Sequence, residues 1–322
     1  MEKLKLNIKN TILVGLAFAS ISAFWETYQY VIPRMLDRTY GLTDSVRGLV
    51  MGLDNILALF LLPLFGRLSD RTNTRFGKRT PYFFFGTIMA VILFVFLPMV
   101  ENKQLSQVRE ISDEITNVEL WDYTKDLEKN NLLKKRVEAR AFSTDGKEQA
   151  EIDLYVKEEF IKISKTNDNG ETNQEYNDFV RPALQNYILK EVTAKNPLSL
   201  IMFLVVLLFL LFAMATYRSP AVALMPDVTP EPLRSPANAI INLMGGIGTV
   251  AIMGLRTVLF AATASGFYDN YYSIVLVTDG LMLVFFLIFM FTVRENKLLA
   301  ERERICLKFG IEEGIDAKAS KT

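Results

Sequence analysis

The sequence contains no histidine and a single cysteine, Cys306. One cysteine excludes an internal disulfide framework, and without histidine the chain lacks the usual zinc ligand, the Ser-His-Asp triad and the commonest proton shuttle. Net charge is lacking too, because 36 Lys and Arg residues balance 36 Asp and Glu residues. That balance favours neither nucleic acid nor a strongly acidic partner. We therefore expect no enzyme, no cofactor and no metal site.

Long apolar runs are abundant instead. A helix needs about 20 mostly apolar residues to cross the hydrocarbon core, and six segments meet that requirement. Residues 82–100 and 198–217 contain no charged side chain. Six buried helices of a large soluble protein are the alternative, but they would require a polar shell that these segments lack. We place the spans at roughly 11–32, 46–68, 81–100, 197–217, 237–262 and 271–293.

Lys and Arg residues in short loops predict the orientation of the spans. The amino terminus, the loop at 67–79 and the stretch after residue 293 are rich in them, which predicts that both termini are cytoplasmic. The first apolar run is long and lacks a small-residue cleavage pattern, so we expect an uncleaved anchor rather than a signal peptide. The chain is thus predicted to be a multi-pass protein of the plasma membrane.

A charged stretch separates the third and fourth spans. Within it, residues 136–142 and 150–156 are strand-like runs around the turn signal Thr144-Asp145-Gly146, and the flanks are helix-like. We predict a small extracytoplasmic α+β insert; a disordered insert is the alternative, although the aliphatic and aromatic content is high for disorder. The predicted domains are 1–100 with helices 1–3, 101–196 as the insert, 197–293 with helices 4–6, and 294–322 as a cytoplasmic tail or the start of a central linker.

The loop between the second and third spans carries the most specific pattern. Residues 66–82 read GRLSDRTNTRFGKRTPY. Glycine allows close helix approach, aspartate can cap a helix or pair with arginine, and the cations hold the loop at the inner surface. The spacing resembles the signature loop of the major facilitator superfamily, in the form of the glycoside-pentoside-hexuronide cation symporters and the sucrose transporters. Its candidate residues are Gly66, Asp70, Arg71, Arg75, Gly77, Lys78 and Arg79.

Two further stretches agree with this resemblance. Residues 24–28, FWETY, followed by Pro33, are similar to the first helix of the sucrose transporters. Residues 219–239 resemble that family's P-x-x-A-L-x-x-D and R-x-x-A-N-A elements, which contain Asp227 and Arg234. The resemblance implies an all-α membrane fold, the amino-terminal six-helix half of a transporter.

The resemblance also implies a function, secondary active transport of a glycoside or an oligosaccharide such as sucrose. In melibiose-type carriers, acidic residues on the second and fourth helices serve the coupling cation. Ala58, Leu62 and Met214 stand at or near those positions here. Proton-coupled symport is therefore expected in place of sodium coupling.

Polar side chains inside the spans are the candidate binding groups, since a charge at the bilayer centre costs about 2.5 to 3.5 kcal/mol without a partner or a wet cavity. Glu26 is the first candidate for binding a proton or a sugar hydroxyl; a structural pair with a cation such as Arg256 is the alternative. Trp25 and Tyr28 suit either a sugar ring or the membrane interface. The other candidates are Asp54, Asn55, Asn238, Asn242 and Asp279, for which interhelical bonding or balance with Arg256 is equally consistent.

Four glycines of the fifth span, Gly245, Gly246, Gly248 and Gly254, favour close helix packing over ligand binding.

Transporters of this superfamily have two six-helix halves with the substrate between them. The predicted partners are therefore a sugar, protons, membrane lipid and either a missing carboxy-terminal half or a second copy of the chain; we expect a truncated or split carrier. The alternative function is a membrane-anchored extracytoplasmic ligand-binding protein without transport activity.

Overall fold

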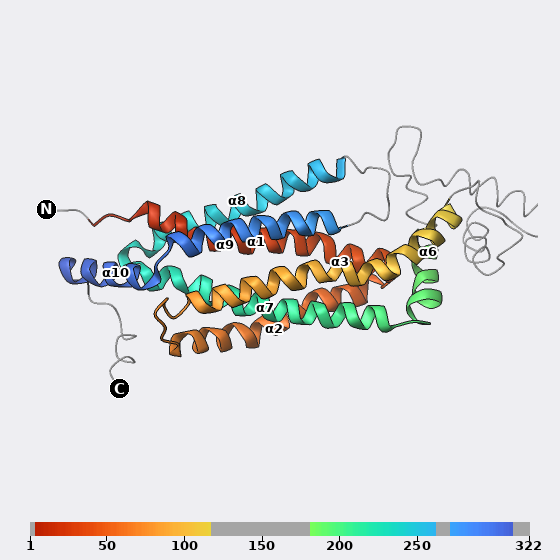
Figure 1. Ribbon diagram of the computed structural model, residues 1–322, viewed down its shortest axis with the longest axis horizontal. Helices are drawn as coiled ribbons and strands as arrows, with labels where there is room; N and C mark the ends of the chain where they lie inside the picture. Colours follow the sequence, from red (N-terminus) through yellow and green to blue (C-terminus); the bar gives the residue numbers. More distant parts are fainter. Residues whose placement is uncertain (1–3, 117–180, 262–270, 312–322) are drawn as a thin grey trace, which may run out of the picture. The chain divides into compact units, whose positions relative to one another are not determined.

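The computed structural model describes residues 4–116, 181–261 and 271–311, and every regular element in these ranges is a helix (Figure 1). The long helices are α1 Ile8–Arg38, α2 Asp44–Arg71, α3 Thr80–Thr116, α7 Leu198–Val228, α8 Arg234–Ala261 and α9 Tyr272–Thr292. The shorter ones are α6 Arg181–Tyr187, a π-helical turn Ile188–Thr193, a 3-10 turn Glu231–Leu233, and α10 Glu295–Phe309.

Six of the described helices are long and apolar enough to cross a membrane, as the sequence predicts. Several run beyond the predicted spans. α7 continues past Tyr217 to Val228, through Pro220 and Pro226. Each proline removes one backbone hydrogen bond, but the helix continues through it. In a helical bundle, packing against neighbouring helices can compensate for the lost bond.

The predicted α+β insert finds no support in the described part of 101–196, which is helical on both flanks. α3 runs unbroken through residue 100, where Glu101 is buried and accepts a hydrogen bond from the Thr39 hydroxyl at 2.5 Å. On the return side, α6 and the π-helical turn cover Arg181–Tyr187 and Ile188–Thr193. The predicted strands at 136–142 and 150–156 lie outside the described residues.

The contacts divide the chain into two units. Unit 1 consists of Met1–Val31, Gly52–Pro98 and Leu204–Thr322, and unit 2 of Ile32–Met51 and Met99–Phe203. All candidate site residues fall in unit 1.

Aromatic packing and close backbone approach hold unit 1 together. The ring of Phe83 on α3 lies 4.3 Å from that of Phe289 on α9 and 5.0 Å from that of Tyr217 on α7, between ring centroids. Tyr217 is fully buried, and its hydroxyl donates to the Ala17 carbonyl of α1 at 2.9 Å. On α8, a Cβ added at Gly248 would lie 2.2 Å from the Ala19 carbonyl oxygen, so α1 and α8 touch through their backbones there.

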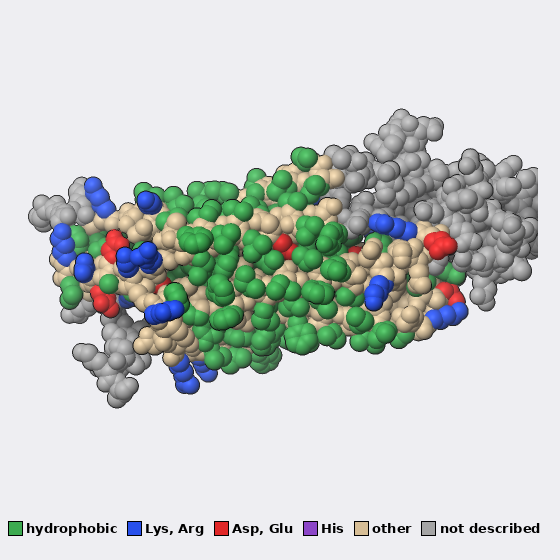
Figure 2. All heavy atoms as spheres, in the orientation of Figure 1, with side chains coloured by type: hydrophobic (Ala, Val, Ile, Leu, Met, Phe, Trp, Pro, Cys, Tyr) green, Lys and Arg blue, Asp and Glu red, His purple; other side chains and the backbone are tan. Residues whose placement is uncertain are grey.

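The outward faces of the long helices in unit 1 are apolar. Leu59 on α2 is 72% exposed and Val258 on α8 is 71% exposed. Figure 2 shows hydrophobic side chains covering the visible length of the helices, with Lys and Arg gathered where the helices end. Such contiguous apolar surface is costly in water and suits a lipid environment.

A buried polar cluster organises unit 2. Asp37, at the end of α1, is 5% exposed and accepts a hydrogen bond from Gln185 of α6 at 2.8 Å, and it pairs with Arg181. Gln104 on α3 donates to the Thr39 carbonyl at 2.8 Å and to the Thr193 hydroxyl at 2.7 Å. The helical flanks of the predicted insert are thus tied to the turn between α1 and α2.

Candidate functional site

Glu26 and Arg256 form an ion pair inside the predicted spans. Nη1 of Arg256 on α8 lies 3.1 Å from Oε1 of Glu26 on α1, and the two side chains are 23% and 21% exposed. The guanidinium of Arg256 also lies over the ring of Tyr30, 4.2 Å from its centroid. This is the pairing named above as the alternative for Glu26, and Glu26 also lines a neighbouring hollow.

The hollow beside Glu26 has a volume of about 370 Å³ and lies between α1, α7 and α8. Its size is at the lower end of the range for ligand pockets. Glu26 and Arg218 bring charge to the lining, while Ser22, Gln29 and Thr249 bring neutral polar groups. The rest of the lining is apolar or aromatic: Phe18, Ile21, Trp25 and Val222.

Trp25 lines both this hollow and a smaller one. The guanidinium of Arg218 lies 5.5 Å from the Trp25 ring, and Arg218 also lines both hollows. Asp54 of α2 lines the smaller hollow, where its carboxylate accepts the backbone N–H of Asn55 at 2.7 Å. Tyr28 is fully buried against Phe24, at 5.8 Å between ring centroids.

Asp279 on α9 forms no ion pair with Arg256 in the described part of the chain. Its side chain is buried, 3% exposed, and neither carboxylate oxygen has a hydrogen-bond partner in the described part of the chain. The adjacent Thr278 bonds to Thr27 of α1, with 2.6 Å between the hydroxyl oxygens. Asn55, Asn238 and Asn242 are exposed and do not line either hollow.

The predicted signature loop forms a network around Arg79. The Arg79 guanidinium pairs with Asp70 of α2 and, through Nε at 2.9 Å, with Asp227 of α7. It also donates to the Ser69 hydroxyl and, at 3.3 Å, to the Gly66 carbonyl. Lys78 reaches the same Asp227 carboxylate at 3.2 Å. One buried arginine therefore joins α2, the start of α3 and the end of α7.

Glu295, the first residue of α10, is a partner of this loop that the sequence analysis missed. It is fully buried and accepts hydrogen bonds from the backbone N–H groups of Lys78 at 2.9 Å and Thr80 at 2.9 Å, and from the Thr80 hydroxyl at 2.8 Å. A carboxylate at the amino end of α3 satisfies unpaired donors and complements the helix dipole. No motif in the tail distinguishes Glu295 from its acidic neighbours.

Gly77 makes room for that carboxylate. Its φ is +120°, a region that favours glycine, and an added Cβ would lie 2.1 Å from Oε2 of Glu295. The remaining predicted loop residues take no part in the Arg79 network. Arg71 is exposed, Arg75 lies over the exposed ring of Phe76 at 4.8 Å, and Arg234 begins α8.

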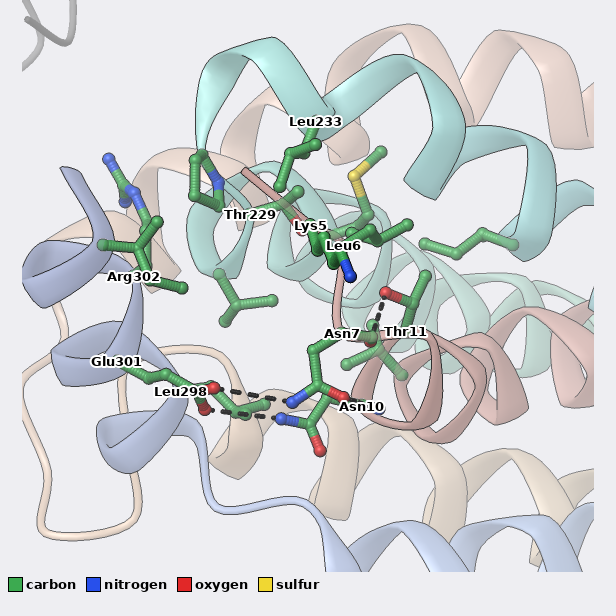
Figure 3. Close-up of a pocket in the computed structure, with 16 residues that line it drawn as sticks. Lys5, Leu6, Asn7, Asn10, Thr11, Thr229, Leu233, Leu298, Glu301 and Arg302 are labelled. Carbon is green, nitrogen blue, oxygen red and sulfur yellow. Dashed lines mark hydrogen bonds between the residues drawn. The ribbon is translucent and has the colours of Figure 1, made fainter. Parts of the chain in front are cut away.

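α10 also touches the amino terminus of unit 1, at a small pocket of about 50 Å³ (Figure 3). Glu301 accepts hydrogen bonds from the side-chain amides of Asn7 and Asn10, both at 3.4 Å. Arg302 donates to the backbone carbonyl of Asp227 at 2.6 Å. α10 therefore contacts α1, the loop before α3 and the end of α7, although it lies in the stretch predicted as a tail or the start of a central linker.

Comparison with known proteins agrees with this architecture. Residues 13–109 match the family model described as MFS/sugar transport protein. The chain is 27% identical over 84 residues to a putative glycoside/cation symporter, YagG, of Escherichia coli (strain K12). The aligned part covers 26% of this chain and 18% of that protein. No solved structure gives a significant match.

The match covers most of α1, all of α2 and most of α3, and it includes the FWETY stretch and the signature loop. Six apolar helices and this match together describe a multi-pass membrane protein. The match supports the resemblance to the sugar transporters of the major facilitator superfamily over residues 13–109.

Proposed function

We propose that the chain is one half of a secondary active transporter that couples a proton to the uptake of a glycoside. The observation that carries the proposal is that Glu26, which pairs with Arg256 at 3.1 Å, lines a hollow of about 370 Å³. An ionisable pair inside a membrane span is expensive unless it faces protein or water, and such groups mark substrate and proton pathways. The match to the sugar-transport family supports this function.

The pair provides a way to link a proton to a sugar. When Glu26 is ionised, its carboxylate holds the Arg256 guanidinium through a charge-assisted hydrogen bond. When Glu26 takes up a proton, that attraction is largely lost and Arg256 is available to a sugar hydroxyl bound beside Glu26. Ser22, Gln29 and Thr249 provide further hydroxyl and amide partners in the same lining.

The Arg79 network acts in this proposal as the contact that holds one conformation. Carriers of this architecture rock one helical half against the other. Arg79 bonds to α2 through Asp70 and to α7 through Asp227, so rearrangement of these helices has to break or reform its bonds. In the proposed carrier the loop and both termini lie on the cytoplasmic side of the plasma membrane, and the excess of Lys and Arg in the loop supports this orientation.

A complete carrier needs a second half. The chain matches over a region that covers 18% of the putative symporter's length, so the whole transport activity belongs to the proposal. A carboxy-terminal six-helix half or a second copy of this chain provides the other wall of the hollow. The segments 1–100 and 197–293 contribute the spans, and 101–196 is the extracytoplasmic insert of the proposed carrier.

The test is uptake of radiolabelled disaccharides into vesicles containing the reconstituted chain, alone and with a carboxy-terminal half. An imposed proton gradient, inside alkaline, should drive accumulation above the external concentration, and a protonophore should abolish it. Accumulation that does not depend on the gradient would contradict symport. Absence of any uptake in both preparations would contradict the transport function.

A further inference from the structure

The arginines around the signature loop divide into a buried one and three exposed ones. Arg79 is buried and pairs with two carboxylates. Arg67 and Arg71 lie on the last turns of α2, and Arg75 lies in the loop that follows. All three are exposed. The proposed function gives these exposed cations no role.

Arg67 and Arg71 have no anionic partner in the described part of the chain. Neither side chain forms an ion pair or a hydrogen bond with the described residues. Asp70, which lies between them in sequence, pairs with Arg79 instead. Because the two arginines are four residues apart on a helix, they project from the same face of α2, one turn apart. A single phosphate group can therefore bind both guanidinium groups.

Exposed leucines continue this face of α2 toward the middle of the span. Leu64 is 47% exposed and Leu68 is 44% exposed. Leu64 precedes Arg67 by three residues and Arg71 by seven, a spacing that puts the three side chains on one side of the helix. Toward its end, the exposed face of α2 thus changes from apolar to basic. A membrane phospholipid has the same order, from acyl chain to phosphate.

The loop after α2 adds an aromatic side chain to this surface. Phe76 is 56% exposed, and the guanidinium of Arg75 lies 4.8 Å from the centroid of its ring. Aromatic side chains are enriched where the hydrocarbon core meets the headgroups, and basic side chains are enriched on the cytoplasmic side of that boundary. The loop therefore has the composition of a segment that lies among lipid headgroups.

We propose that the end of α2 binds an anionic phospholipid, with Arg67 and Arg71 holding its phosphate and Leu64 and Leu68 contacting its acyl chains. This inference rests on the orientation in the proposed function, which puts the loop at the cytoplasmic leaflet, where anionic lipids attract basic segments. The lipid is a ligand separate from the sugar, because neither arginine lines the hollow beside Glu26.

A lipid with a net negative charge fits this site better than a zwitterionic lipid does. Two guanidinium groups face the phosphate, and the amine of an ethanolamine or a choline headgroup would bring a third positive charge close to them. Asp70 is the acid nearest in sequence, but its carboxylate is bonded to Arg79. Phosphatidylglycerol has no amine and keeps the charge of its phosphate, so it is the expected ligand.

The test compares lipids with the same acyl chains and different headgroups. The full chain is prepared in a neutral detergent, and the affinity for the first bound lipid is measured by native mass spectrometry. We expect dioleoyl phosphatidylglycerol to bind at least about tenfold more tightly than dioleoyl phosphatidylcholine or phosphatidylethanolamine. sn-Glycerol 3-phosphate has a phosphate but no acyl chains, so at equal concentration it should not displace the bound lipid.

Variants assign the preference to the end of α2. Replacing both arginines, Arg67→Gln with Arg71→Gln, should remove most of the preference for phosphatidylglycerol. Replacing both by lysine should keep part of it, because the charges remain but the bidentate geometry is lost. Lys297→Gln with Arg304→Gln is the matched control, since it removes two exposed cations of α10 and should keep the preference. Circular dichroism checks that all variants have the same helix content.

The outcomes separate lipid binding from transport. Equal binding of the three lipids, or tighter binding of phosphatidylethanolamine, would overturn the proposal. A preference that survives the loss of both α2 arginines, or one that the α10 control loses equally, would also overturn it. Displacement by sn-glycerol 3-phosphate would show a phosphate site rather than a lipid site. Sugar uptake is not needed for any of these measurements, so failed uptake would contradict the transport function and leave the lipid site standing.

Discussion

Nε of Arg79 lies 2.9 Å from Oδ2 of Asp227, although 148 residues separate them in the sequence. The contact joins the start of α3 to the end of α7, and Lys78 reaches the same oxygen at 3.2 Å. Arg79 is 6% exposed and Asp227 is 21% exposed at the side chain, so the pair is largely shielded from solvent. A pair of this kind has a measurable effect on stability.

Asp227→Asn is expected to lower the free energy of unfolding by about 1–3 kcal/mol, because it leaves the buried Arg79 without one of its carboxylates. The change is measured by thermal unfolding of the detergent-solubilised chain, followed by circular dichroism. Arg71→Gln is the control, since Arg71 belongs to the same loop but is exposed. Equal effects of the two variants would show that the Asp227 contact contributes nothing specific.

Gly77→Ala is expected to release α10 from the loop. Its added Cβ would lie 2.1 Å from Oε2 of Glu295, and its φ of +120° is strained for alanine. Gly310→Ala is a matched control, because Gly310 also has a positive φ, +62°, but nothing lies within 4 Å of its added Cβ. The control should lower the free energy of unfolding by about 1 kcal/mol. Gly77→Ala should lower it by clearly more.

Limited proteolysis of the stretch that contains α10 reports the release. Cleavage within Glu295–Phe309 should accelerate in Gly77→Ala relative to Gly310→Ala. Equal cleavage rates would contradict the proposed contact between Gly77 and Glu295.

Gly248→Ala should destabilise the packing of α1 on α8, by about 1–3 kcal/mol, since the new methyl group meets the Ala19 carbonyl oxygen at 2.2 Å. Gly246→Ala, two residues earlier, has nothing within 4 Å and should stabilise α8 by up to about 1 kcal/mol through helix propensity. Chemical denaturation of both variants in detergent gives the comparison. A stabilising Gly248→Ala would contradict the close approach.

These two positions show how far the sequence could predict the packing. Four glycines on the fifth span favoured close packing as a group, but the added-Cβ distances separate Gly248, which touches α1, from Gly246 and Gly254, which have no neighbour within 4 Å. Helical periodicity alone does not reveal which face of α8 meets α1, because apolar residues lie on both its lipid-facing and its protein-facing sides.

The transmembrane helices themselves were predictable because length and hydropathy determine them. All six predicted spans have a helical counterpart, with ends shifted by several residues. α3 extends to Thr116 because Glu101 and Gln104 find buried partners in unit 2, and such partners are distant in sequence. α10 and Glu295 were missed for the same reason, since the groups that Glu295 binds lie more than 200 residues earlier.

Glu26→Gln is expected to abolish proton-driven accumulation of sugar while sparing exchange of labelled for unlabelled sugar, because the amide cannot carry the coupling proton. Asp279→Asn is the comparison variant. Its carboxyl is buried without a partner in the described residues and lines neither hollow, so accumulation should persist. If Asp279→Asn abolished proton-driven accumulation and Glu26→Gln kept it, the coupling proton would have to bind Asp279 and not Glu26.

The central claim is that Glu26 faces water inside a membrane-spanning bundle, and thiol labelling tests it most directly. The single native cysteine, Cys306, is first removed by Cys306→Ser, and Glu26→Cys or Leu59→Cys is then introduced. Leu59 is 72% exposed on the apolar face of α2. In membranes, a hydrophilic methanethiosulfonate reagent should label the Glu26→Cys chain and leave the Leu59→Cys chain unmodified; labelling of Leu59→Cys with Glu26→Cys unmodified would contradict the account.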